Sequence, residues 1–388
     1  MARPDYDGGS ILNLMSSIIQ ARGGRSDAPS LRDLPTDELA QATNLILLVI
    51  DGLGADWLAR RSPDGILSRA RRATLTSVFP STTAAAIPTF LTGEAPLVHG
   101  LTGWHTYLGE LGCVMTVLPG TPRFGGVPYR QAGIDPVKLF GTTPVSDRIT
   151  TRSVLVSPAH IARSDFNRAH LGRGELVVFK GLRDMFTRTA GVLRGWGRRR
   201  EPKYLYLYWP GLDAIGHEHG MESPAAQAHL LAIEQEIATF MHDITDTDSL
   251  LLISADHGQL DTSAADAIDL ADHPELESHL LLPLCGEPRA AFCYLRSGHA
   301  DAFRAYCSDV LVNRVDLVAS EQLVEEGLFG TGRQHVRFME RVGDVCLLPK
   351  ANGVIRQWLP FEQPHQQIGV HGGLSEAELR VPLCLLRT

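Results

Sequence analysis

Three aspartates and three histidines in this sequence are spaced in a way that suits metal binding. His217 lies four residues after Asp213, and His257 directly follows Asp256. Carboxylate oxygens and imidazole nitrogens are good ligands for Zn²⁺ and similar cations. A single histidine is more often a structural core residue, but six such residues together suffice for two divalent-metal sites. The set consists of Asp51, Asp213, Asp256, His217, His257 and His371.

Thr83 is the candidate nucleophile. It ends a run of small hydroxyl residues, Ser81-Thr82-Thr83, which precedes Ala84 and further helix-forming alanines. This pattern predicts the N-terminus of a helix, where free N–H groups and the helix dipole favour an anion such as a phosphoryl group. A hydroxyl coordinated there by a metal loses its proton more easily and becomes a competent attacker. The alternative is that these hydroxyls only cap the helix.

Three apolar segments position the aspartates. Residues 45–50, 204–209 and 250–253 read as strands that are buried on both faces, as in a parallel sheet. Each of them leads into one of the acidic residues, Asp51 directly and Asp213 and Asp256 after a short turn. Residues 224–242 form an amphipathic helix between the second and third of these strands. Because the carboxyl ends of parallel strands meet at one edge, we expect the aspartates to lie together there.

The same order of strands and helices predicts the domain organisation. We expect an α/β fold with a mostly parallel central sheet and helices on both faces. Residues 1–274 and 346–388 form this catalytic core, and residues 275–345 form a small inserted α+β subdomain, because their pattern mixes short strands with a helix. Ser375 is expected to cap a short helix, and residues 380–383 to form a final buried edge strand.

These motifs, taken in order, resemble the type I phosphodiesterase/nucleotide pyrophosphatase branch of the alkaline phosphatase superfamily. The resemblance rests on Asp51 after a strand, the run from Phe79-Pro80 through Thr83 to Thr92-Gly93, and four histidine motifs. It covers residues 44–100, 204–260 and 343–388. The four motifs are His99-Gly100, Asp213 with His217, Asp256-His257-Gly258 and His371-Gly372.

The resemblance implies an alkaline phosphatase-like fold and a role for each residue of the set. Asp51, Asp256, His257 and Thr83 would hold one metal ion. Asp213, His217 and His371 would hold the other. Thr83 would attack phosphorus and form a phosphorylated enzyme, which water then hydrolyses at the second metal. Zinc is the implied metal, and manganese or iron is chemically tolerable with these ligands.

The sequence departs from the family at one point. Family phosphodiesterases usually carry Phe-Pro-Asn-His after the nucleophile, and the Asn donates to a phosphoryl oxygen. Here residues 84–87 are Ala-Ala-Ala-Ile, so that Ala86 stands in place of the Asn. Loss of one such donor costs several kcal/mol of transition-state stabilisation, about 3 to 4, unless another group replaces it. Trp104, His105, Tyr107 and the arginines between residues 181 and 200 are possible replacements.

Composition restricts the partners. The formal net charge of −8 argues against a nucleic-acid duplex, because such partners require a basic surface. The sequence begins without a signal-peptide pattern, and no apolar run reaches the roughly 20 residues that a membrane span needs. The six cysteines are scattered and stand in apolar surroundings, which predicts buried free thiols. We therefore expect a cytoplasmic protein with a small phosphorylated substrate; the oligomeric state has no signature here.

The leading hypothesis is metal-dependent hydrolysis of a phosphate ester through a phosphothreonine intermediate, with diester or pyrophosphate bonds favoured. The missing Asn keeps phosphomonoester and phosphonate hydrolysis open. A metal-dependent phosphotransferase or mutase of the same superfamily is the alternative among enzymes. A metal-stabilised binding module without catalysis is the alternative outside them.

Overall fold

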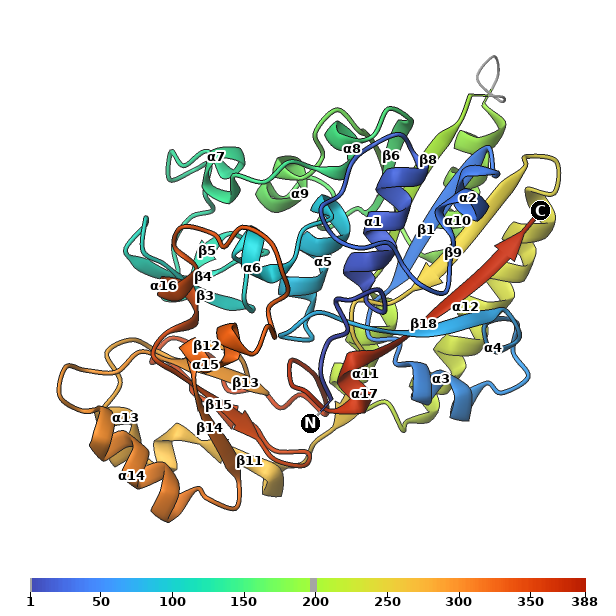
Figure 1. Ribbon diagram of the computed structural model, residues 1–388. Helices are drawn as coiled ribbons and strands as arrows, with labels where there is room; N and C mark the ends of the chain where they lie inside the picture. Colours follow the sequence, from blue (N-terminus) through green and yellow to red (C-terminus); the bar gives the residue numbers. More distant parts are fainter. Residues whose placement is uncertain (1, 196–200) are drawn as a thin grey trace.

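The computed structural model describes residues 2–195 and 201–388, which are organised around two seven-stranded sheets (Figure 1). The main sheet has the strand order β2-β18-β9-β1-β8-β6-β7. Its strands are β1 (Asn44–Ile50), β2 (Arg71–Thr76), β6 (Arg152–Pro158), β7 (Glu175–Phe179), β8 (Lys203–Trp209), β9 (Ser249–Ser254) and β18 (Arg380–Arg387).

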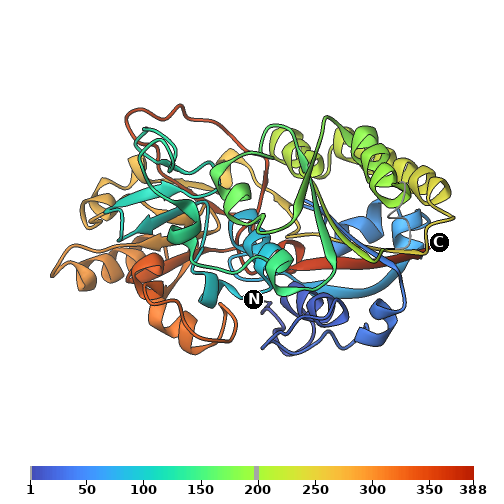
Figure 2. The same cartoon turned by 90° about the horizontal axis from the view of Figure 1, so that it is seen from above.

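The main sheet is mostly parallel, as the sequence predicts. Strand β1 lies between β8 and β9 and is parallel to both, and β6 is parallel to β7 and β8. Every residue of β1 is buried. Helices explain this burial, because they cover both faces of the sheet (Figure 2). The α/β fold class is therefore confirmed.

The two faces of the sheet are covered by helices from different parts of the chain. Helix α1 (Ile11–Ala21) packs with α2 (Thr36–Ala40) and α5 (Thr83–Thr92) on one face, and α10 (Leu182–Arg194) packs with α12 (Pro224–Asp243) on the other (Figure 2). Helix α12 begins at Pro224 and is capped by the Ser223 hydroxyl. Its predicted apolar stripe is buried: Leu230, Ile233, Ile237 and Phe240. The helix predicted over residues 224–242 is thus confirmed.

The second sheet is antiparallel and has the order β14-β15-β13-β12-β3-β4-β5. Its strands are β3 (His105–Leu108), β4 (Cys113–Thr116), β5 (Thr121–Pro122), β12 (Cys285–Glu287), β13 (Ala290–Cys293), β14 (Val315–Ala319) and β15 (Val345–Pro349). The Gly286–His105 pair joins the two contributing segments. The sheet thus extends beyond residues 275–345, and the proposed domain boundaries remain a prediction.

Short elements connect the two bodies and cover the second sheet. The short helices are α3 (Ala55–Arg61), α4 (Ile66–Arg69), α6 (Pro96–His99), α7 (Pro136–Phe140), α8 (Val145–Arg148), α9 (Asp165–Ala169), α11 (Gly211–His219), α13 (Pro274–Ser278), α14 (Ala300–Val310), α15 (Ser320–Glu325), α16 (Phe338–Val342), α17 (Glu376–Leu379) and the 3₁₀ turns Ala264–Asp266 and Leu270–Asp272. Two strand pairs complete the fold: β10 (Leu260–Asp261) with β17 (Gly369–Val370), and β11 (Ala267–Asp269) with β16 (Val354–Arg356).

The C-terminal strand differs from its prediction. Ser375 does cap α17, but β18 is an internal strand, because β2 pairs with its outer side. The edge-strand prediction for residues 380–383 was therefore wrong. The physical reason is that β2 is largely exposed and begins with two arginines, so it lacks the apolar pattern by which strands are recognised.

All six cysteines carry free thiols, and five of them are buried, while Cys113 is half-buried. This confirms the prediction of free thiols.

Among the residues that the structure describes, no helix combines the length and the apolar character needed to cross a lipid bilayer.

Candidate active site

The strand ends bring the predicted ligands into two clusters. Asp51 follows β1, Asp213 lies in the first turn of α11 after β8, and Asp256 follows β9. Because these three strands are parallel neighbours, their carboxylates reach one edge of the sheet. The clusters are Asp51 with Asp256 and His257, and Asp213 with His217 and His371; within each cluster the candidate ligand atoms lie within 4.8 Å of one another.

In the first cluster, the candidate ligand atoms of two carboxylates and one imidazole converge. His257 Nε2 lies 3.3 Å from Asp51 Oδ1 and 3.5 Å from Asp256 Oδ2. These two carboxylate oxygens are buried and accept no hydrogen bond from any described residue. Burial raises the pKa of Asp51 well above its ordinary value, and the charges of Asp213 and Asp256 raise it further. Such a group of oxygens fits a cation, which would satisfy all of them at once.

The second cluster is centred on the Asp213 carboxylate. His217 Nε2 lies 3.2 Å from Asp213 Oδ2, and His371 Nε2 lies 3.7 Å from Asp213 Oδ1. Burial alone would raise the pKa of Asp213, but the charge and hydrogen bond of His217, with the charge of His371, hold it well below its ordinary value. The rings of His257 and His371 stack with centroids 3.7 Å apart, so the two clusters are adjacent.

Backbone carbonyls orient all three histidines in the same way. Nδ1 lies 2.7 Å from Gly369 O in His217, 3.1 Å from Gly258 O in His257, and 3.3 Å from Ser81 O in His371. A carbonyl only accepts, so each Nδ1 carries the proton and donates it. Each Nε2 is therefore the nitrogen that faces the carboxylates, and it is the atom that a bound cation would use, which is the usual arrangement of histidines that bind a metal.

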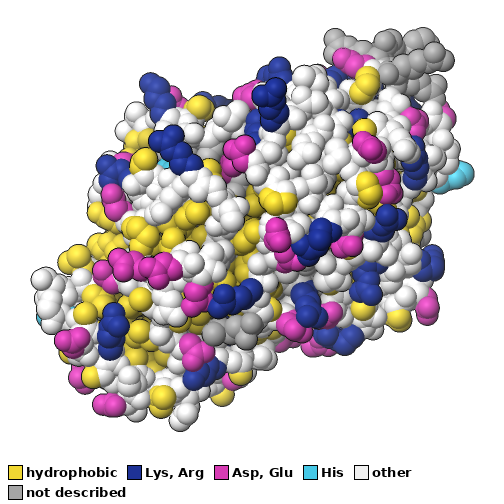
Figure 3. All heavy atoms as spheres, viewed as in Figure 1, with side chains coloured by type: hydrophobic (Ala, Val, Ile, Leu, Met, Phe, Trp, Pro, Cys, Tyr) yellow, Lys and Arg dark blue, Asp and Glu magenta, His cyan; other side chains and the backbone are white. Residues whose placement is uncertain are grey.

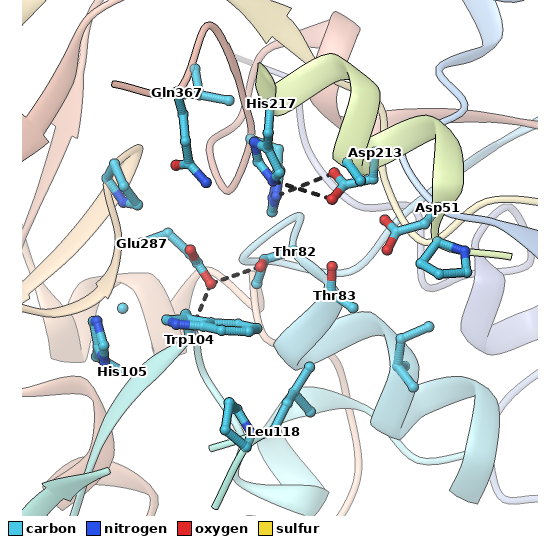
Figure 4. Close-up of a pocket in the computed structure, with 18 of the residues that line it drawn as sticks. Asp51, Thr82, Thr83, Trp104, His105, Leu118, Asp213, His217, Glu287 and Gln367 are labelled. Atoms are coloured by element: carbon cyan, nitrogen blue, oxygen red, sulfur yellow. Dashed lines mark hydrogen bonds and ion pairs between the residues drawn. The ribbon is translucent and has the colours of Figure 1, made fainter. Parts of the chain in front are cut away.

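Thr83 stands at the start of α5, as predicted, with Thr82 at the N-cap. Its Oγ1 lies 3.1 Å from His257 Nε2, and Figure 4 shows the Thr83 and Asp51 side chains pointing toward each other. The first-turn N–H groups of Thr83 and Ala84 donate to no described residue, since Thr82 O is already bonded to the N–H groups further along the helix. These groups are therefore free to bind an anion beside the hydroxyl.

Glu287 is a site residue that the sequence analysis missed. It ends β12, and its Oε1 accepts hydrogen bonds from Thr82 Oγ1 and Trp104 N, each 2.7 Å long (Figure 4). Burial raises the pKa of Glu287 to about 7. In the sequence this glutamate only precedes a proline, a pattern that has no catalytic signature. Tyr208 was also missed: its hydroxyl donates to Asp51, although only the strand around it was predicted.

Asp51, Thr83 and the second cluster open into one cavity of about 700 Å³, which is lined by residues of both sheets. Of the possible replacements for the missing Asn, Trp104 and His105 line this cavity, whereas the Tyr107 ring packs against Tyr294. None of the described arginines between residues 181 and 195 lines it, and Arg198, Arg199 and Arg200 lie outside the described residues.

Comparison with known proteins gives one family. Residues 45–357 match the family described as type I phosphodiesterase/nucleotide pyrophosphatase. No curated protein matches the sequence. Among solved structures, murine ectonucleotide pyrophosphatase/phosphodiesterase 5 is similar with a TM-score of 0.67 and 16% identity over 87% of each chain. An inactive form of that murine protein was solved in complex with AMP and has a TM-score of 0.66, at 15% identity over 87% of each chain.

A second type of enzyme shares the fold. Phosphonoacetate hydrolase from Sinorhizobium meliloti, solved with phosphonoformate, has a TM-score of 0.63 and 17% identity over 89% of this chain and 90% of its own. At such identities the likeness to these structures establishes the fold alone.

Proposed function

Because the chain belongs to the type I phosphodiesterase/nucleotide pyrophosphatase family, we propose that it cleaves phosphate esters at Thr83 between the two ligand clusters. Family membership makes it a phosphoric ester hydrolase, of the phosphodiesterase or pyrophosphatase type. One observation carries the proposal: a threonine hydroxyl at a helix N-terminus lies 3.1 Å from His257 Nε2, and the two carboxylate oxygens nearest that nitrogen accept no hydrogen bond from any described residue.

The clusters would hold two divalent ions. Asp51, Asp256 and His257, with Thr83, form one site, and Asp213, His217 and His371 form the other. When bound, such ions supply positive charge that lowers the pKa of a nearby hydroxyl and stabilises the charge on a phosphoryl group. The mixed set of carboxylate oxygens and imidazole nitrogens suits zinc, and it tolerates manganese or iron.

The residues of the chain then have distinct tasks. The Thr83 oxygen attacks phosphorus in line and loses its proton to solvent; an oxygen–phosphorus bond forms, and the bond to the leaving group breaks with its electron pair. Water hydrolyses the resulting phosphothreonine and restores the hydroxyl. The N–H groups of Thr83 and Ala84 bind the phosphoryl oxygens, which compensates for Ala86 in place of the family Asn.

The substrate is a small phosphorylated molecule, with a diester or pyrophosphate bond favoured by the family. A cavity of about 700 Å³ fits such a ligand. On the face drawn in Figure 3, acidic and basic side chains of the described residues are interspersed, in keeping with the negative net charge, instead of forming a basic surface for a duplex. Phosphonate hydrolysis is the second candidate, because the phosphonoacetate hydrolase shares the fold.

The test is turnover of a nitrophenyl nucleotide diester and of nitrophenyl phosphate, with zinc or manganese added. Thr83→Ala is expected to lower kcat by at least about 10³-fold, since it removes the nucleophile. Thr187→Ala, an exposed threonine on α10, is the control. Wild-type turnover in the Thr83 variant would refute the proposal. Release of free phosphate from the monoester separates a hydrolase from a mutase.

We also propose a reducing, cytoplasmic setting, supported by the six free thiols. Fractionation of cells that express the protein naturally, followed by thiol labelling, tests it. Recovery outside the cytoplasm would refute it.

A further inference from the structure

Two arginines line the catalytic cavity, and their surroundings differ. Arg123 makes four hydrogen bonds: its Nε and Nη2 donate to Glu362 over 2.9 and 3.1 Å, and its Nη1 and Nη2 donate to the carbonyls of Leu284 and Gln357 over 2.8 and 2.7 Å. The side chain of Arg356 makes no hydrogen bond or ion pair within the described part of the chain. Arg123 is therefore structural, whereas Arg356 has all its donors available.

Arg356 lines the same cavity as the proposed nucleophile, and a short series of contacts links their two segments. It ends β16, whose Ile355 N–H donates to Pro288 O over 2.8 Å. Pro288 directly follows Glu287, which accepts the hydrogen bond from Thr82. Strand β16 is also fixed from the other side by its pairing with β11. The position of Arg356 is thus set by the same β12 segment that contacts the start of α5.

An unbonded guanidinium in this position favours an anion. Arg356 is half-buried and carries five N–H donors in a planar fork that matches a carboxylate or a phosphoryl group. Burial lowers the pKa of Arg356, although the nearby charge of Asp269 raises it. Asp269 forms no ion pair with Arg356, because its carboxylate caps the next 3₁₀ turn instead. Among the described cavity residues, Arg356 is the one lysine or arginine without an acidic partner.

We propose that Arg356 forms an anion subsite in the catalytic cavity, which binds a second phosphoryl or carboxylate group of the substrate, away from the phosphorus that reacts. The substrate class is then a phosphate ester, pyrophosphate or phosphonate with at least two oxyanion groups. This assignment rests on the proposed function, since the second group is defined relative to the phosphorus that Thr83 attacks.

The experiment compares the binding of anions that differ only in the second group. The metal-loaded protein is titrated calorimetrically with inorganic pyrophosphate and phosphonoacetate, and with methylphosphonate as the probe with one oxyanion group. Arg356→Gln is expected to weaken the binding of pyrophosphate or phosphonoacetate at least about tenfold more than the binding of methylphosphonate, because a charge-assisted hydrogen bond is lost. Which of the two probes is affected identifies the second group as phosphoryl or carboxylate.

Two further variants keep the result unambiguous. Arg356→Lys retains the charge but not the fork, so it should restore part of the affinity difference. Arg304→Gln removes an exposed arginine of α14 and should leave the ratio of affinities at its wild-type value. Melting temperatures establish that all variants fold.

If Arg356→Gln weakened the binding of all three probes equally, or of none of them, the proposed anion subsite would be wrong. These affinity ratios do not depend on turnover. If the protein binds the probes in this way but hydrolyses nothing, the proposed function fails and the subsite remains. If Thr83→Ala abolishes turnover but the ratios do not change, only the subsite fails.

Discussion

The Thr82 hydroxyl donates a 2.7 Å hydrogen bond to Glu287, although Thr82 occupies the N-cap position of α5. An N-cap threonine usually accepts a hydrogen bond from the first turn of its own helix. Here the hydroxyl turns to the second sheet, which leaves the N–H groups beside Thr83 free. A residue 205 positions away in the sequence thus determines where the hydroxyl at this end of the helix points.

This relationship predicts that Glu287 is a positioning residue. Glu287→Ala leaves the Thr82 hydroxyl and the Trp104 N–H without their acceptor, at a cost of about 1 to 3 kcal/mol for each buried group. We expect kcat of the Ala variant to fall at least about tenfold. Glu287→Gln keeps an oxygen acceptor and should recover most of kcat, whereas Glu287→Met, which is similar in volume but has no oxygen acceptor, should not. Equal kcat in the wild-type enzyme and the Ala variant would contradict this role.

The first ligand cluster predicts opposite effects of one substitution with and without metal. In metal-free protein, Asp51→Asn should raise the melting temperature, because it replaces a carboxyl group whose ionised form is disfavoured by burial and by the charges of Asp213 and Asp256. In the wild-type protein, added metal should stabilise by about 4 kcal/mol at a thousandfold excess over its Kd. Asp51→Asn should lose most of that gain.

Calorimetric scans with chelator and with zinc measure both effects. Asp309→Asn, an exposed aspartate of α14, serves as the control and should follow the wild type in both conditions. A metal-free Asp51→Asn protein that melts below the wild type would show that the carboxylate is stabilised by something other than a cation.

A buried ion pair supports the loop that presents His371. Arg289 and Glu378 are 3% and 0% exposed, and two hydrogen bonds of 3.1 and 2.8 Å join them. Glu378 also accepts the Gly373 N–H. Arg289→Ala should cost about 3 to 5 kcal/mol of unfolding free energy, since it leaves Glu378 buried and unpaired.

Urea unfolding measures this cost, and Arg337→Ala is the matched control. The Arg337–Glu340 pair is exposed and should contribute less than about 1 kcal/mol. Because Gly373 follows His371 closely, the Arg289 variant should also bind metal more weakly. If Arg289→Ala lowered the free energy of unfolding as little as the control does, the buried ion pair would not be needed for stability.

The catalytic half of the fold could be predicted from the sequence because it depends on local patterns. Strand β1 is a continuous apolar run that is followed by Asp51. Such a run predicts that the strand is buried on both faces, and it also predicts the sheet edge at which the next side chain lies. The candidate ligand pairs Asp213 with His217 and Asp256 with His257 are close in sequence, so their spacing alone suggested them.

The remaining features depend on long-range contacts that leave no local pattern. The second sheet pairs His105 with Gly286, from segments that are far apart in the chain, so neither segment identifies the other. Glu287 and Arg356 acquire their positions only through this sheet. Strand β2 is exposed and charged, which is why the strand that it covers, β18, was taken for an edge.

The last prediction concerns His99, whose motif supported the family resemblance. The structure buries His99 outside the catalytic cavity, where its Nδ1 accepts the Leu101 N–H over 3.1 Å and its Nε2 lies 3.2 Å from Thr89 Oγ1. Burial lowers the pKa of His99 from 6.5 to about 3. Between these two pKa values His99 is protonated in the unfolded chain but neutral in the folded protein. The contribution of neutral His99 to the free energy of unfolding is therefore complete above pH 6.5 and is lost as the pH falls toward 3.

His99→Asn should reduce this loss, because the Asn oxygen can accept the Leu101 N–H and does not titrate. Unfolding free energies measured in urea between pH 7 and pH 4 should fall less steeply for the variant, by about one proton per molecule. His242→Asn, which replaces an exposed histidine of α12, controls for the loss of a histidine in general. Since metal ligands titrate equally in all three proteins, the difference in slope isolates His99. Identical slopes for the wild type and His99→Asn would mean that His99 is protonated to the same extent in the folded and unfolded states.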